Sequence, residues 1–80
     1  MPGKRADRLP GDLPTSKVLR ALQRLGFVLD HEGGKHTVLK DPTKPLRVAV
    51  VPRHARIKAS LLRAILKAAG ITEADFLARY

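Results

Sequence analysis

The sequence contains no cysteine, which excludes a disulfide framework and any metal site built on thiolates. It also lacks an apolar run near the roughly 18 residues of a membrane-spanning helix, and its first residues have no apolar stretch typical of a signal peptide. We therefore expect a cytoplasmic protein that does not associate with membranes.

Aromatic residues are scarce, because Phe27, Phe76 and Tyr80 are all that the chain has, and two of them lie near its end. Proteins that read single-stranded nucleic acid stack bases on several aromatic rings. The sequence therefore argues against a base-stacking platform and favours recognition of a phosphate backbone or of shape.

Positive charge, in contrast, is abundant: 16 Lys and Arg against 7 Asp and Glu give a formal net charge of +9 in 80 residues. Residues 1–12 contribute three basic and two acidic side chains, so residues 13–80 carry +8 of this charge. A folded domain with such an excess predicts a polyanionic partner.

The chain divides into a terminal arm and one small domain. Residues 1–12 contain two Pro-Gly pairs and no periodic apolar pattern, so we expect a flexible N-terminal arm. The remaining residues are enough for one hydrophobic core. We therefore predict a single domain over residues 13–80.

Apolar residues at helical spacing predict an amphipathic helix over 16–25, with the Thr15 hydroxyl as its N-cap and Gly26 at its C-terminal end. A second apolar stripe predicts a helix over about 59–69 that stops at Gly70. Both helices present one apolar face, so both should pack on the same core.

Three β-type runs lie between these helices, over 27–31, 36–40 and 46–51. The first two flank Gly33 and Gly34, which would permit positive φ in a tight hairpin turn. Consecutive strands with short connections favour antiparallel pairing.

Thr72 and Asp75 form a variant of the capping box, which predicts a short helix over 73–80. The order of elements is thus α-β-β-β-α followed by a short C-terminal helix. It predicts an α+β fold, in which both long helices cover one face of a three-stranded antiparallel sheet and the other face stays open.

The alternation of side chains along the strands predicts which residues lie on the open face. Lys40 should avoid the core, so His36, which has the same parity, points outward and Thr37 points inward. We expect Arg47 to point outward as well. The predicted core consists of Val18, Leu22, Leu25, Phe27, Leu39, Val48, Val50, Leu62, Ile65 and Leu66.

His36 would then lie among the cations Lys35, Lys40 and Arg47, an arrangement suited to a phosphodiester. RNA carries its own nucleophile, the 2′-hydroxyl, so cleavage needs a base for its proton and cations for the developing charge. Histidine titrates near neutrality, and the adjacent Lys35 should lower the pKa of His36 and keep it neutral. The alternative is an ordinary surface histidine.

A basic loop follows the third strand and contains Arg53, His54, Arg56 and Lys58, which we expect to contact a phosphate backbone. His54 could bind phosphate, serve as a second acid–base group or only cap the loop. We expect His31 to be solvated. The histidines lack the spacing and the company of a metal site, so no metal or cofactor is expected.

Three segments resemble the HicA toxins of bacterial toxin–antitoxin pairs. GKHTVL at 34–39 is similar to the family's segment around the catalytic histidine, VPRH at 51–54 to its V-P-x-H, and LRAILKAAGI at 62–71 to its last long helix. A further similar pair stands at 76–77, and the resemblance covers residues 13–77. Lys35 stands where the family usually has Ser or Thr, and Leu39 where an aromatic residue or Met is common.

This resemblance implies a fold like that of double-stranded-RNA-binding domains. It also implies a toxin that cleaves mRNA without metal, uses His36 as the catalytic residue and is inhibited by a HicB antitoxin bound over the active site.

Two other functions stay open from the residues. A non-catalytic RNA- or DNA-binding module fits the charge and the fold, and Lys35 favours it. A pure interaction protein would instead dock an acidic partner on its open sheet face or edge strand. Cleavage of RNA distinguishes the toxin from both.

Overall fold

The computed structural model describes residues 9–80, and residues 45 and 46 by their backbone alone. The elements in this range are β1 (Asp12–Pro14), α1 (Thr15–Arg24), β2 (Val28–Glu32), β3 (His36–Asp41), β4 (Lys44–Pro52), β5 (Arg56–Lys58), α2 (Ala59–Ala69) and α3 (Glu73–Arg79). β2, β3 and β4 form an antiparallel sheet in that order, and β1 pairs with β5 as a second, two-stranded sheet.

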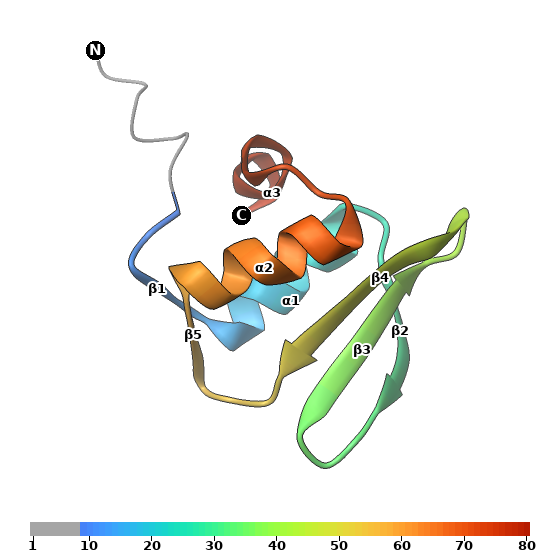
Figure 1. Cartoon of the computed structure of the whole chain (residues 1–80), viewed down its shortest axis with the longest axis horizontal. Coiled ribbons are helices and arrows are strands. Elements are labelled where there is room, and N and C mark those ends of the chain that lie inside the picture. The colour runs from blue at the N-terminus through green and yellow to red at the C-terminus, as the bar shows by residue number, and fades with distance from the viewer. Residues whose placement is uncertain (1–8) are drawn as a thin grey trace.

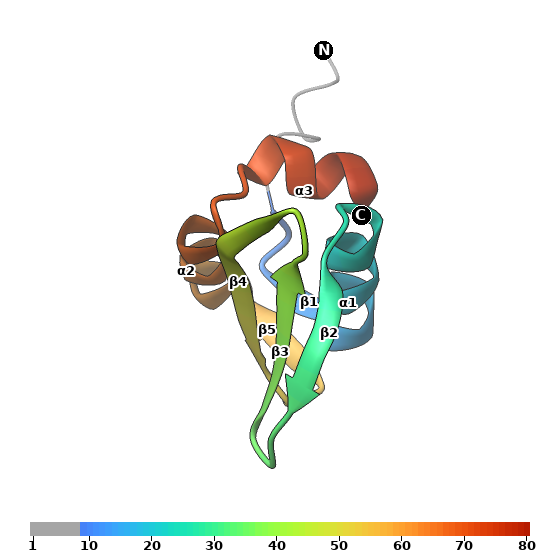
Figure 2. The same ribbon diagram turned by 90° about the vertical axis from the view of Figure 1, so that its right-hand side faces the viewer.

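The helices lie on one side of the three-stranded sheet. α1 and α2 cover its inner face (Figure 1), and α3 lies across both of these helices (Figure 2). The outer face of β2, β3 and β4 is turned toward the viewer in Figure 2. The predicted α+β fold is therefore confirmed. Within the described part of the chain, no helix is long and apolar enough to cross a membrane.

The helix ends follow the local sequence. α2 has the predicted bounds and ends at Gly70, whose φ of 73° is left-handed, and Gly26 after α1 has a φ of 100°. Both positions favour glycine because a Cβ is strained there. The Thr72 side chain accepts a hydrogen bond from the Asp75 backbone N at 3.1 Å, which confirms the predicted cap of α3.

Thr15 does not cap α1, contrary to the prediction. Pro14 occupies the N-cap position, and the Thr15 hydroxyl instead donates to the His54 carbonyl. The Thr15 backbone N donates to the Ala55 carbonyl at 3.0 Å. Thr15 therefore ties the connection between β4 and β5 to the start of α1.

The prediction of a basic loop after β4 is wrong for its second half, because Arg56–Lys58 form the strand β5. β5 pairs with β1, and the facing residues Leu13 and Ile57 are both buried. The short pairing satisfies backbone groups on both segments while two apolar side chains enter the core. Each of these two strands has only three residues and one buried apolar side chain, so the sequence shows no alternating pattern that would predict them.

The predicted arm over residues 1–12 lies mostly outside the described residues. Within the described part, Leu9 is 7% exposed and belongs to the core, and Asp12 belongs to β1. These contacts hold the end of the predicted arm against the domain.

The predicted facing of β3 is confirmed. Thr37 and Leu39 are buried against the helices, whereas His36 and Lys40 are exposed on the outer face. In β4 the predicted facing is wrong. Val50 lies on the outer face and is 46% exposed. The buried apolar core comprises Leu9, Leu13, Val18, Ala21, Leu22, Phe27, Leu39, Ala49, Val51, Ile57, Ala59, Leu62, Ile65, Leu66, Ala69, Ile71 and Phe76.

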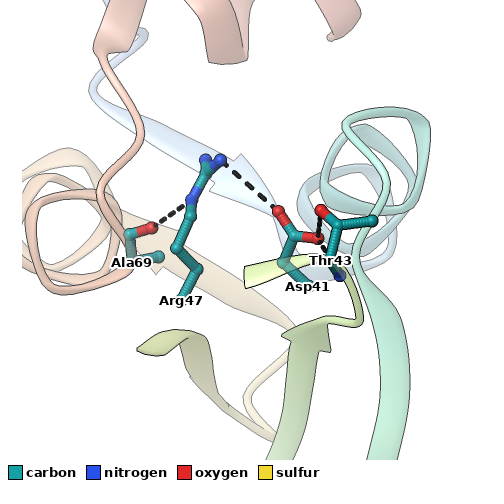
Figure 3. A network of polar contacts seen from close by, with 4 residues as sticks. All are labelled: Asp41, Thr43, Arg47 and Ala69. Carbon is teal, nitrogen blue, oxygen red and sulfur yellow. Dashed lines mark hydrogen bonds and ion pairs between the residues drawn. The ribbon is translucent and has the colours of Figure 1, made fainter. Parts of the chain in front are cut away.

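Arg47 lies on the helix side of the sheet rather than on the outer face, which corrects its predicted position. Its Nε donates to the Ala69 carbonyl at 3.0 Å, and its guanidinium lies 5.3 Å from the centroid of the Phe27 ring. Its Nη1 is 3.4 Å from a carboxylate oxygen of Asp41 (Figure 3). An arginine can turn inward here because its stem covers apolar surface while its head finds acceptors.

Asp41 is held in turn by Thr43. One Asp41 oxygen accepts from the Thr43 hydroxyl at 2.6 Å and from the Thr43 backbone N at 2.9 Å (Figure 3). The hydroxyl bond first, and then the backbone bond, lower the pKa of the Asp41 carboxyl. The turn between β3 and β4 is thereby linked through Arg47 to the end of α2.

Because Val51 faces the core and Val50 the outer face, we expect truncation of these adjacent valines to cost very different amounts of stability. Val51→Ala should lower the free energy of unfolding by about 2 kcal/mol, since it empties part of the core. Val50→Ala, the matched control on the outer face, should change it by no more than about 0.5 kcal/mol. Urea unfolding of both variants measures this difference, and the reverse order of the two losses would mean that Val50 faces the core.

Candidate functional site

His36 is the first residue of β3 and pairs with Pro52, near the end of β4. Its side chain is exposed on the outer face. The His36 carbonyl accepts a hydrogen bond from the Gly33 backbone N at 2.8 Å, which closes the turn between β2 and β3. The end of the sheet therefore fixes the backbone that carries the imidazole.

Arg53 joins His36 at this end of the sheet. Its backbone N donates to the Lys35 carbonyl at 2.9 Å, and its guanidinium Nη1 donates to the Gly33 carbonyl at 3.1 Å. These bonds hold a guanidinium beside the turn although Arg53 follows Lys35 by 18 positions in the chain. We call Gly33, Gly34, Lys35, His36 and Arg53 the hairpin-end site. In Figure 2 the turn between β2 and β3 lies at the bottom, away from α3.

The two glycines of the turn do not have the predicted conformation. Positive φ among the described glycines is confined to Gly26 and Gly70, so neither Gly33 nor Gly34 adopts it. A Cβ built at Gly34 would meet nothing within 4 Å, and one at Gly33 would make an ordinary contact of 3.8 Å with the His36 carbonyl oxygen. The fold thus does not require glycine at Gly34, and the bare backbone leaves space for a ligand.

The other predicted cations lie apart from His36 or are paired. Arg47 is on the inner side, as described above. Lys40 shares the outer face with His36, but its Nζ lies 3.1 Å from Asp30 Oδ1. Lys58 is exposed on β5. The positive charge next to His36 therefore comes from Lys35 and Arg53.

Arg56 is also paired. Its Nη2 lies 2.9 Å from Asp12 Oδ1, and its Nε donates to the same oxygen at 3.0 Å. The hydrogen bond raises the pKa of Arg56 and lowers the pKa of the Asp12 carboxyl. Arg56 therefore braces the β1–β5 pair, and its charge is partly compensated.

His54 lies in the connection between β4 and β5, and its carbonyl accepts from Thr15. The first backbone N–H of α1 is taken by Ala55, and the Ala59 N of α2 donates to the Gly11 carbonyl at 3.0 Å. Neither helix offers this first N–H to an anion beside His54. His54 thus lies in a loop whose backbone is held by hydrogen bonds from Thr15.

Three polar side chains, those of Asp30, His31 and Lys40, gather on the outer face, and His31 is 65% exposed, in line with the expectation that it is solvated. Asp30 Oδ2 lies 2.8 Å from His31 Nδ1, and Asp30 Oδ1 lies 3.1 Å from Lys40 Nζ. The bond from His31 first, and then that from Lys40, lower the pKa of the Asp30 carboxyl. The only sign of this pair in the sequence is that Asp30 and His31 are adjacent. Adjacent residues in a regular strand point to opposite faces, so their adjacency does not predict a contact.

The outer face also carries apolar side chains. Val28 and Val50 are each nearly half exposed, and Val38 and Val48 are partly buried beside them. The described structure has no pocket. In residues 9–80, no group of three or more His, Asp or Glu side chains could hold a metal ion. The site is therefore an open surface, which suits a polymer or a protein better than an enclosed small molecule.

Comparison with known proteins identifies a family whose model matches this chain. The family model described as HicA toxin of bacterial toxin-antitoxin matches residues 15–71, which is more than half of the chain. This match extends from the start of α1 past the end of α2 and contains the hairpin-end site. A search of curated proteins found no match.

Proposed function

The chain belongs to the HicA toxin family, and from this premise we propose that it is a metal-independent endoribonuclease that cleaves mRNA with His36 as its catalytic residue. Membership of the family makes it a toxin of a bacterial toxin–antitoxin pair. The catalytic residue, the independence from metal and the mRNA substrate are our proposal.

One observation carries the assignment: His36 is exposed at the hairpin end with Lys35 next to it and the anchored Arg53 guanidinium beside the same turn. The imidazole can accept the 2′-hydroxyl proton as that oxygen attacks phosphorus. Only one Arg53 donor is used by Gly33, so its other N–H groups can face a phosphate. Because the RNA supplies the nucleophile, this step needs no metal-bound water.

We expect the cations beside His36 and those farther from it to contribute differently to RNA binding. We assign the contacts nearest the cleaved phosphate to Lys35 and Arg53. Lys40 and Lys58, which are exposed, and the braced Arg56 would add longer-range attraction to the backbone, and the exposed His54 would offer it a hydrogen-bonding ring. Arg47 is withdrawn from this set because it faces the helices.

We further propose that a HicB-type antitoxin covers the outer face and blocks His36. The half-exposed Val28 and Val50 offer apolar contact, and the basic surroundings favour an acidic partner. Action on mRNA would place the toxin in the cytoplasm, and residues 13–80 would act as one domain.

His36→Ala should lower the rate of RNA cleavage by about 10²- to 10⁴-fold, the usual share of acid–base catalysis. Since the side chain is exposed, the free energy of unfolding should change by less than about 0.5 kcal/mol. The measurement is cleavage of RNA by purified parent and variant in EDTA, with thermal unfolding followed in parallel.

Cleavage by His36→Ala at the parent rate would contradict the catalytic role, and loss of parent activity in EDTA would contradict metal independence. If the parent binds RNA but never cuts it, the non-catalytic binding module is the better function. Lys35→Ser then tests whether the lysine suppresses cleavage.

Arg53→Ala should weaken RNA binding more than Arg56→Ala. A single lost phosphate contact should reduce the slope of log K against log salt by about 0.7 to 0.9. Arg56 should change the slope less, because Asp12 already compensates it. Titrations of several RNA sequences over a range of salt concentrations test this order, and an Arg53 effect confined to one sequence would indicate base readout instead.

A further inference from the structure

A β-bulge in β2 places two consecutive side chains on the outer face. Leu29 pairs with Leu39 and His31 with Val38, so the pairing skips Asp30. In such a bulge two residues of one strand lie opposite one residue of the other. Asp30 and His31 therefore both lie opposite Val38, and the ion pair of Asp30 with Lys40 indicates the same outer face.

His31 is a cross-strand neighbour of His36. His31 lies opposite Val38, and His36 precedes Val38 by two residues on the same face of β3. Diagonal neighbours of this kind have Cα atoms roughly 7–8 Å apart, within reach of long or aromatic side chains. The His31 side chain is 65% exposed, so a phosphate could lie between the two imidazoles.

Asp30 orients the His31 ring. The carboxylate can only accept a hydrogen bond, so the His31 Nδ1 at 2.8 Å carries the proton that it donates to Asp30. The other ring nitrogen, Nε2, is then left for the substrate. Lys40 holds the second Asp30 oxygen and keeps the carboxylate in place. His54, in the connection to β5, has no comparable place in the three-stranded sheet.

We propose that His31 is a second catalytic residue, the general acid that protonates the leaving group while His36 acts as the base. This proposal rests on the function proposed above. The 2′-hydroxyl proton moves to His36, the bond from O2′ to phosphorus forms, and the bond from phosphorus to O5′ breaks. O5′ takes a proton from Nε2 of protonated His31.

The products are a 2′,3′-cyclic phosphate and a 5′-hydroxyl end. His36 ends with an extra proton and His31 has lost one, so exchange with water restores both residues. No oxidant, reductant or further reactant enters the step. Asp30 does not touch the substrate and is a positioning residue.

The test compares two RNA oligonucleotides that contain a cleavage site mapped with the parent protein. One has the ordinary phosphodiester, and the other has sulfur in place of O5′ at that site. A thiolate leaves without being protonated, so a general acid matters only for the ordinary linkage. His31→Ala should cut the ordinary RNA about 10²- to 10³-fold more slowly and the sulfur-linked RNA within about tenfold of the parent.

Three further variants complete the comparison. His36→Ala should be slow on both substrates, because the 2′-hydroxyl must lose its proton in each. Asp30→Asn should show a smaller form of the His31→Ala pattern, since the ring remains but loses its carboxylate. Glu32→Gln, the neighbouring residue on β2 opposite inward-facing Thr37, should cut both RNAs at the parent rate and serves as the matched control.

Equal losses of His31→Ala on both substrates would overturn the proposal, because they would indicate a role in binding or folding. Parent-like cleavage by His31→Ala together with an inactive His36→Ala would overturn it while leaving the proposed function intact. A parent protein that cuts neither RNA would overturn both.

Discussion

The register between β3 and β4 sets Thr37 opposite Val51 and Leu39 opposite Ala49, and these four buried side chains face the helices. Because strand side chains alternate, the same register fixes the outer face. It also places His36 opposite Pro52, so that Arg53 comes directly beside the turn between β2 and β3. The core and the hairpin-end site are thus two consequences of one pairing.

The sequence allowed the facing of β3 to be predicted but not that of β4. In β3 the charged Lys40 directly follows the apolar Leu39, so the alternation of side chains shows which residues face outward. Within residues 46–51 of β4, Arg47 is the one charged residue in an otherwise apolar run, and an outward arginine is the natural expectation. It turns inward because there it hydrogen-bonds to the Ala69 carbonyl, pairs with the Asp41 carboxylate and lies over the Phe27 ring. Such tertiary partners have no local signature.

The helices, their terminal glycines and the α3 cap were predictable because each depends on neighbours in the sequence. The β1–β5 pair and the use of Thr15 were not, because each joins segments about 40 residues apart. For the candidate site, His36 and the cation Lys35 were identified from one short segment. The anchoring of Arg53 and the pairing of His31 with Asp30 depend on the β4 end and on a bulge.

The central claim is that RNA binds the outer face of the sheet at the hairpin end. Amide chemical-shift mapping of the isotope-labelled His36→Ala chain with a short RNA at low salt tests it most directly. We expect the largest shifts on residues 31–36 and Arg53. Largest shifts on α1 and α2, with the hairpin end unchanged, would place the RNA on the helical side and would contradict binding at the hairpin end.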